Sequence, residues 1–150
     1  MSTPSTLDDC RVAGIRQHLE APGHEPRRWT IPSYAGQPRT ELTIVASRDV
    51  GQRGSRRRAR GYAHHLHLSF MAHVDGRPSL VDDEDLNHWV PLILGAYASY
   101  AHVRPVARPG GDTDMSQWST VTTHVDVFLD RNGRPMVPEG PHAITPWRAA

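Results

Sequence analysis

The chain has 150 residues, of which 37% are hydrophobic and 22% are charged, and this composition favours one folded domain over a disordered segment. The single cysteine, Cys10, excludes an internal disulfide framework, and no apolar run approaches the roughly 18 residues that a membrane span requires. All 17 positive side chains are arginines, and the net charge of +1 argues against a dedicated DNA-coating protein. We expect no secretory signal, and we expect a protein of the cytoplasm or of a virion.

The first element predicted is a helix over residues 5–23, which Ser5 or Thr6 can cap and which Pro22-Gly23 ends. A connection rich in proline and glycine follows and extends to about residue 38. Residues 39–47 then alternate between apolar and polar side chains, which predicts a half-buried strand.

A second strand is predicted from about Tyr62 to Val74, and it is expected to pair with the first strand as a hairpin. The tip of this hairpin is a basic loop over about residues 48–61. Five arginines lie within eight residues of it: Arg53, Arg56, Arg57, Arg58 and Arg60. Such a loop suits phosphate groups or an acidic protein surface, although no aromatic side chains alternate with the arginines to stack on bases.

The second helix is predicted to start at Asp82, with Asp85 three residues later in capping position. Its apolar side chains recur at helical spacing, and we expect Trp89, Ile93 and Tyr97 to be buried against the sheet. Pro91 lies inside this pattern, so the helix should kink there or split into two pieces.

The C-terminal third predicts an edge strand around Pro105, a strong strand over residues 119–130, a type I′ turn at Asn132-Gly133 and a short return strand. An extended tail follows over about residues 138–150. The order α-β-β-α-β-β predicts a single α+β domain over residues 1–150, with a mixed or antiparallel sheet of four to five strands and two helices on one face.

The stretch from Gly61 to Val74 holds four of the ten histidines. In a strand, alternate residues share a face, so Leu66, Leu68 and Phe70 fall on an apolar face. The polar face carries His65, His67 and His73. Burial alone explains this pattern, and we therefore expect a structural strand that carries no stoichiometric metal.

A divalent metal site is the alternative interpretation of these histidines. His65 and His67 are about 7 Å apart along a strand, close enough to share one ion, whereas His73 is about 20 Å from His67. His124 and Asp126 share the polar face of a later strand and could complete the site if that strand is a neighbour. Three ligands with an open position are typical of a catalytic metal site.

The motif His65-Leu66-His67 resembles the metal-binding strand of the HUH nucleases, which nick single-stranded DNA. In that family the following helix carries a tyrosine that attacks the phosphodiester, and Tyr97 and Tyr100 lie on the following predicted helix here. The family's lysine near the tyrosine has no counterpart, because the chain contains no lysine.

Three functions follow from these observations. We expect first a small non-catalytic binding or assembly protein that contacts a protein partner or associates with itself. Its element order also occurs in phage head–tail connectors, tail terminators and small phage-encoded inhibitors, which is an analogy of fold only. The alternatives are a metal-dependent phosphodiesterase or nickase, and an accessory protein that binds nucleic acid through the arginine loop.

Overall fold

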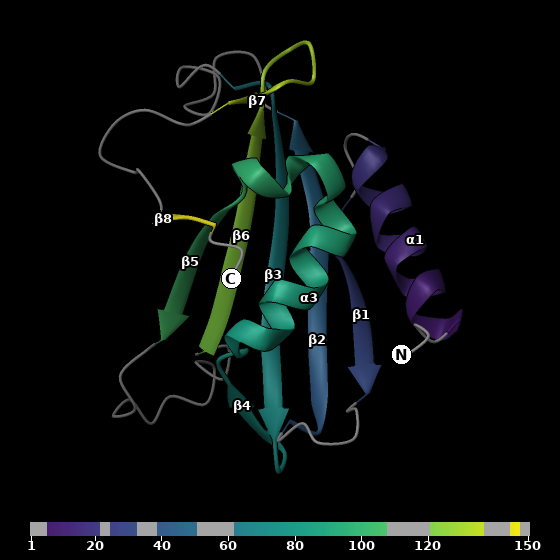
Figure 1. Cartoon of the computed structure of the whole chain (residues 1–150), viewed down its shortest axis with the longest axis vertical. Coiled ribbons are helices and arrows are strands. Elements are labelled where there is room, and N and C mark those ends of the chain that lie inside the picture. The colour runs from purple at the N-terminus through teal and green to yellow at the C-terminus, as the bar shows by residue number, and fades with distance from the viewer. Residues whose placement is uncertain are drawn as a thin grey trace.

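The computed structural model describes residues 6–21, 25–32, 39–50, 62–107, 121–136 and 145–147. Within these ranges the chain forms one antiparallel sheet with helices on one of its faces, which confirms the predicted α+β class (Figure 1). The helical elements are α1 (Thr6–Glu20), α3 (Asp83–Leu94) and the 3₁₀ helix η1 (Gly95–Tyr100).

The sheet contains eight strands in the described part of the chain and is therefore larger than the four to five expected. The strands are β1 (Arg27–Pro32), β2 (Glu41–Val50), β3 (His64–Val74), β4 (Arg77–Ser79), β5 (His102–Ala107), β6 (Val121–Leu129), β7 (Pro135–Met136) and β8 (Thr145–Pro146). Their order is β1-β2-β3-β6-β5-β8, with β4 paired to β3 and β7 paired to β6. The predicted hairpin of β2 and β3 is present, and β6 occupies the other side of β3.

Strand β1 lies in the segment that the sequence presented as an irregular connection. It pairs with β2 along its whole length, and Ile31 is buried opposite Leu42. Over this stretch the side chains alternate between two faces: Trp29 and Ile31 face the core, and Arg28 and Thr30 face away. The alternation is short and is flanked by prolines and glycines, and for this reason the sequence favoured an irregular connection. Pro32 is tolerated because β1 is an edge strand.

The core lies between the sheet and the two helices, which pack on the same face. Trp89 of α3 is completely buried, as predicted, and Ile15 of α1 is buried in the same cluster. The sheet supplies the opposite wall of this cluster mainly through the apolar residues of β2, β3 and β6: Leu42, Ile44, Ala46, Leu66, Leu68, Phe70, Val125, Val127 and Leu129.

Helix α3 begins as predicted, because the Asp82 carboxylate accepts a hydrogen bond from the backbone N–H of Asp85 at 2.9 Å. One α-helix continues through Pro91, and the split considered from the sequence is not observed. The α geometry ends at Gly95, whose positive φ of 54° suits glycine, and η1 follows. The prediction that Tyr97 is buried is wrong, since its exposed fraction is 36%. A 3₁₀ helix has three residues per turn, so Tyr97 leaves the buried stripe of α3.

The turn chemistry also differs from the sequence-based expectation. The two-residue turn with two positive φ angles is Asp75-Gly76, which joins β3 to β4. After β6, Asn132 is not among the residues with positive φ, whereas Gly133 is. Here the Asp130 backbone N–H donates to the Arg134 carbonyl oxygen across a three-residue loop, which a glycine in the left-handed region closes.

A buried ion pair connects the chain just before β2 to the first turn of α3. Arg39 donates from Nε to Oδ2 of Asp85 at 2.6 Å and from Nη2 to Oδ1 at 3.2 Å. Arg39 Nη1 also donates to the backbone carbonyl oxygens of Ile31 and Pro32. Both partners are almost fully buried, so each depends on the other for the interactions it has lost with water.

Replacing one member of this pair should be strongly destabilising. We expect Asp85→Ala to lower the free energy of unfolding by about 3–5 kcal/mol, because it removes the carboxylate that accepts two hydrogen bonds from the buried Arg39 guanidinium. Asp83→Ala is the matched control, since Asp83 is exposed in the same helical turn, and it should cost less than about 1 kcal/mol. Urea denaturation measures both, and equal losses would contradict the proposed role of the pair.

Candidate metal centre

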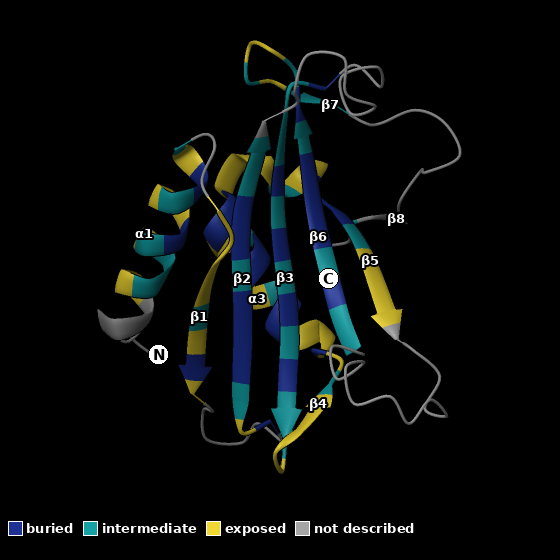
Figure 2. Cartoon of the chain, turned by 180° about the vertical axis from the view of Figure 1, so that it is seen from behind, coloured by how far each residue is buried: buried dark blue, intermediate teal, exposed yellow. Residues whose placement is uncertain are grey.

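The polar residues of β3 lie on the face of the sheet away from α1 and α3, which we call the open face. Figure 2 shows this side of the sheet, with strands β1, β2, β3, β6 and β5 in front and α3 behind them. His65, His67 and Ser69 of β3 belong to the open face, because the residues that alternate with them are in the core. The predicted division of β3 into an apolar and a polar face is confirmed.

The antiparallel register places further polar side chains beside these residues. Across the β3–β6 pair, His67 lies opposite Asp126 and Ser69 lies opposite His124. On the far side of β6, His102 of β5 also lies opposite Asp126. Directly opposed residues have Cβ atoms about 5 Å apart, so the register alone makes these side chains neighbours.

The Asp126 carboxylate is the centre of a hydrogen-bonded cluster. Its Oδ1 atom lies 2.6 Å from His65 Nε2 and 2.7 Å from His67 Nδ1. The other ring nitrogen of His67, Nε2, lies 2.9 Å from the Ser69 hydroxyl, which is 3.1 Å from His124 Nδ1. Five side chains from two strands therefore form one connected network.

One set of proton positions satisfies all of these contacts with neutral imidazoles. His124 Nδ1–H donates to the Ser69 oxygen, and the Ser69 hydroxyl donates to His67 Nε2. His67 Nδ1–H and His65 Nε2–H then both donate to Asp126. Every hydrogen bond in this assignment is directed toward the carboxylate, so the network is arranged around a negative charge.

The pKa shifts agree with an ionised Asp126 and a neutral His124. Burial by itself raises the pKa of Asp126, but the hydrogen bonds from His65 and His67, with the electrostatic attraction that follows them, outweigh burial and hold that pKa well below its usual range. The pKa of His124 is lowered, first by burial and then by the charges of His67 and Arg104, while Asp126 opposes this shift. Asp126 is thus an anion over the whole physiological pH range.

Aromatic side chains fix the orientation of the His65 ring. Phe128 stacks on it with the ring planes 9° apart and the centroids separated by 4.6 Å. Tyr62, which is buried, contacts both His65 and Phe128. A ring held in this way does not have to be ordered when a ligand arrives, which lowers the entropic cost of binding.

Three ligand atoms in the cluster converge closely enough to hold a metal ion. His65, His67 and Asp126 each offer one atom, and these atoms lie within 4.8 Å of one another. His65 Nδ1 faces Asp49 Oδ2 across 3.8 Å, which is too long for a direct hydrogen bond. The second nitrogen of His67, Nε2, is hydrogen-bonded to Ser69. Metal-binding histidines in proteins almost always have such a partner on the second nitrogen.

The structure brings together all four residues of the metal alternative, His65, His67, His124 and Asp126, although His124 reaches the others through Ser69. Tyr97 does not join them, because it lines a cavity together with Leu66 on the helical face of the sheet. Tyr100, one 3₁₀ turn further, is exposed. The five arginines of the basic loop lie outside the described residues.

Three members of the site were not identified from the sequence. Ser69 is two residues from His67 and four from His65, so the two-residue period of a strand already placed its side chain on the same face as theirs. His102 and Asp49 are nearby only because β5 and β2 are in a particular register with β6 and β3, which the local sequence does not specify.

Comparisons of the chain with protein-family models, with curated proteins and with solved structures find no match. Among the described residues, no helix combines the length and the apolar character that crossing a membrane requires. The functional proposals below therefore depend on the side chains and their geometry.

The cluster predicts how stability changes with pH in protein kept free of metal by a chelator. At pH 7, Asp126→Asn should lower the free energy of unfolding by about 1–3 kcal/mol, because it removes a charged acceptor of two hydrogen bonds. The folded-state pKa of Asp126 is below the unfolded value, so its stabilisation is complete above about pH 4 and decreases as the pH falls further.

The difference in stability between wild type and Asp126→Asn should therefore shrink between about pH 4 and pH 2. Asp75→Asn is the control, because Asp75 lies in an exposed turn and asparagine tolerates its positive φ. A difference that stays constant across this range would show that Asp126 is not the acceptor described.

Proposed function

We propose that the protein binds one divalent transition metal ion at His65, His67 and Asp126, and that it uses the ion to activate water for hydrolysis. The observation that carries the proposal is the convergence of the three ligand atoms within 4.8 Å, together with the hydrogen bond between Ser69 and the second nitrogen of His67. The sequence favoured a non-catalytic protein without metal, and that expectation stays untested.

Two nitrogens and one carboxylate oxygen are donors that suit Zn²⁺, and three protein ligands are the usual number in catalytic zinc sites. The same donor set also suits Fe²⁺ in oxygen-activating enzymes. We favour Zn²⁺, because hydrolysis needs only water as co-reactant. The contacts of 2.6 Å and 2.7 Å around Asp126 would have to lengthen by less than about 1 Å to admit an ion with bonds of about 2.0–2.2 Å.

Both imidazoles can carry their proton on the nitrogen that does not bind the metal. His65 would bind through Nε2 and move its proton to Nδ1, which faces Asp49. His67 would bind through Nδ1 and carry its proton on Nε2, from which it donates to the Ser69 oxygen. Each imidazole thus loses its hydrogen bond to Asp126 and gains a metal bond, while Ser69 keeps the His67 ring in place and Phe128 keeps the His65 ring in place.

The remaining coordination positions would hold water on the open face. The side chains of His65 and His67 are 15% and 21% exposed, so a substrate can approach them from this side. A bound metal lowers the pKa of its water toward neutrality. The resulting hydroxide would attack an ester carbon or a phosphorus atom, and the departing oxygen would leave as an alcohol after taking up a proton.

Metal titration tests the binding step. Calorimetry with Zn²⁺, and absorption spectra with Co²⁺, should show about one ion per wild-type chain. His67→Ala and Asp126→Ala should abolish this binding, and Ser69→Ala should weaken it by about 10–100-fold, as expected for loss of a partner on a ligating imidazole. His73→Ala is the matched control, because His73 is on the same face of β3 but about 20 Å from His67, and it should bind normally.

Hydrolysis of bis(4-nitrophenyl) phosphate and 4-nitrophenyl acetate tests the chemical step. Activity should require the metal and should be lost in His67→Ala, while His73→Ala should retain it. Wild-type protein that binds neither Zn²⁺ nor Co²⁺ would refute the metal site. Protein that binds metal but hydrolyses neither compound would leave metal binding in place and remove the hydrolytic function.

A second candidate function is that of a serine hydrolase, and it is suggested by the chain of contacts from Asp126 through His67 to Ser69. Asp126 contacts Nδ1 of His67 and Ser69 contacts Nε2, which is the sequence of contacts in serine hydrolases. This candidate ranks second, because Ser69 lies in a strand paired on both sides and offers no free backbone N–H for an oxyanion. Labelling of Ser69 by a fluorophosphonate in the presence of a chelator would favour it over the metal site.

The non-catalytic binding or assembly role, with a protein partner or a second copy of the chain, also stays a proposal, as do nucleic-acid binding through the arginine loop and a location in the cytoplasm or a virion. The assembly role rests on an analogy of the predicted element order, and the nucleic-acid role rests on the five arginines of the basic loop. They rank behind the metal site, because that site is built from described side chains in direct contact.

A further inference from the structure

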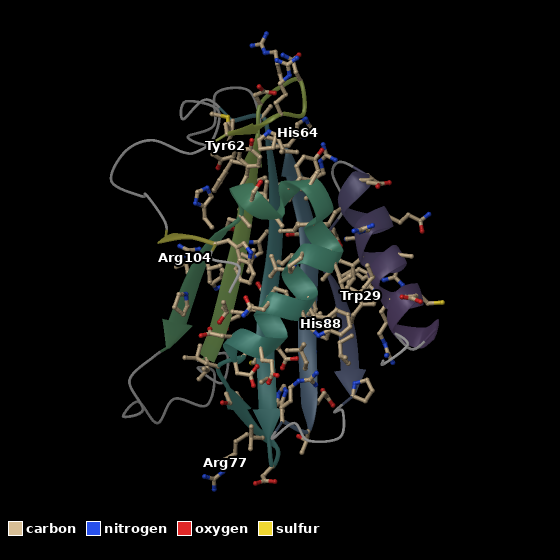
Figure 3. The ribbon with its side chains drawn as sticks, viewed as in Figure 1. Trp29, Tyr62, His64, Arg77, His88 and Arg104 are labelled. Carbon is tan, nitrogen blue, oxygen red and sulfur yellow. The ribbon has the colours of Figure 1, made fainter. Side chains whose placement is uncertain are left out.

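A cavity of about 260 Å³ opens on the helical face of the sheet, on the side opposite the histidine cluster. It lies where both α1 and α3 end, beside the ends of β2, β3 and β6. In Figure 3 this is the end of the sheet that carries His64, and Arg77, the first residue of β4, marks the opposite end.

The floor of the cavity is apolar. Leu66 of β3 and Leu129 of β6 line it from the sheet, and both are almost completely buried. Leu19, Ile93 and Leu94 line it from the ends of α1 and α3. A hydrocarbon group placed here would remove further apolar surface from water, which stabilises a complex by about 25 cal/mol per Å².

The charged part of the lining consists of two arginines and one glutamate, Arg16 and Glu20 from α1 and Arg48 from β2. Arg48 Nη1 donates to the carbonyl oxygens of Leu19 and Glu20 in the last turn of α1. Arg16 Nε donates to the carbonyl oxygen of Ile93 in the last turn of α3. Both guanidinium groups thus satisfy carbonyl groups that a helix C-terminus leaves open, and their positive charge offsets the negative end of the helix dipole.

Capping does not use all the donors of these arginines. Arg48 Nε is buried and has no hydrogen-bond partner among the described residues, and the same holds for Nδ1 of the nearby His64. A buried guanidinium donor without an acceptor is costly, so an anion that accepts from it would be favoured.

The charge balance of the lining selects the kind of anion. Arg16 and Arg48 contribute two positive charges and Glu20 one negative charge, which leaves one net positive charge among the lining residues. A single negative charge matches this balance, whereas a polyphosphate would place its additional charges near Glu20.

We propose that this cavity binds a small amphipathic monocarboxylate, with its carboxylate on the Arg48 and Arg16 guanidinium groups and its hydrocarbon chain on Leu66, Ile93 and Leu129. The site is separate from the histidine cluster, because the two sites use opposite faces of β3. The proposal does not depend on metal binding or on hydrolysis.

Octanoate is the probe for this site. Calorimetry should show saturable binding of about one octanoate per wild-type chain, in protein treated with a chelator so that the histidine cluster cannot contribute metal ligands. Acetate lacks the hydrocarbon chain and octylamine has the opposite charge, so both should bind at least about tenfold more weakly. Absence of octanoate binding, or equal binding of octylamine, would overturn the proposal.

Methyl NMR of the wild-type protein locates the bound probe without any substitution. Octanoate should shift the methyl resonances of Ile93, Leu66 and Leu129, which line the cavity, and leave that of Ile31 unchanged. Ile31 is a suitable reference, because it is equally buried but lies in β1, away from the cavity. Shifts at Ile31 with none at Ile93 would place the ligand elsewhere and overturn the assignment.

Substitutions then test the anion contacts. Arg48→Gln should weaken octanoate binding by about tenfold or more, because it removes a charged hydrogen-bond donor. Arg77→Gln is the matched control at the opposite end of the sheet and should bind octanoate as wild type does. Arg16→Gln, at an exposed position of α1, serves if Arg48→Gln does not fold, and affinity unchanged in that variant would also overturn the proposal.

Discussion

The two-residue period of β3 is the constraint on which both faces of the molecule depend. Leu66, Leu68 and Phe70 pack under the helices, and the residues between them must therefore point to the open face. A slip of one residue in the register would place His65 and His67 in the core. The packing that prevents this slip also holds His67 opposite Asp126, so the core packing sets the geometry of the cluster.

The sequence predicted this division of β3, because burial in a strand repeats every two residues and the pattern runs over eleven residues. It also named His124 and Asp126, on the condition that their strand is a neighbour of β3. That condition depends on β6 lying between β3 and β5, a long-range pairing that local patterns do not encode. The exposure of Tyr97 was missed for a related reason, since a change from α to 3₁₀ geometry alters the period on which the prediction relied.

The fold separates two kinds of chemistry that lie only a few residues apart in sequence. His65 and His67 contribute to a polar cluster centred on a buried carboxylate, while Leu66 between them forms part of an apolar cavity whose rim is positively charged. Because these residues share one strand, their backbone cannot move independently. A ligand on either face would stabilise the same central strand, so occupancy of one site would reduce unfolding of the other.

The buried pair of Arg39 and Asp85 has a consequence for how this protein can diverge among its descendants. A chain that keeps only one of the two residues carries an uncompensated charge in its interior, at a cost comparable with much of the stability of a domain this size. Two apolar side chains of similar volume would be tolerated, but every single-substitution route to them crosses that intermediate. Sequences descended from this one should therefore either retain both residues or have exchanged both, and mixed pairs should be rare.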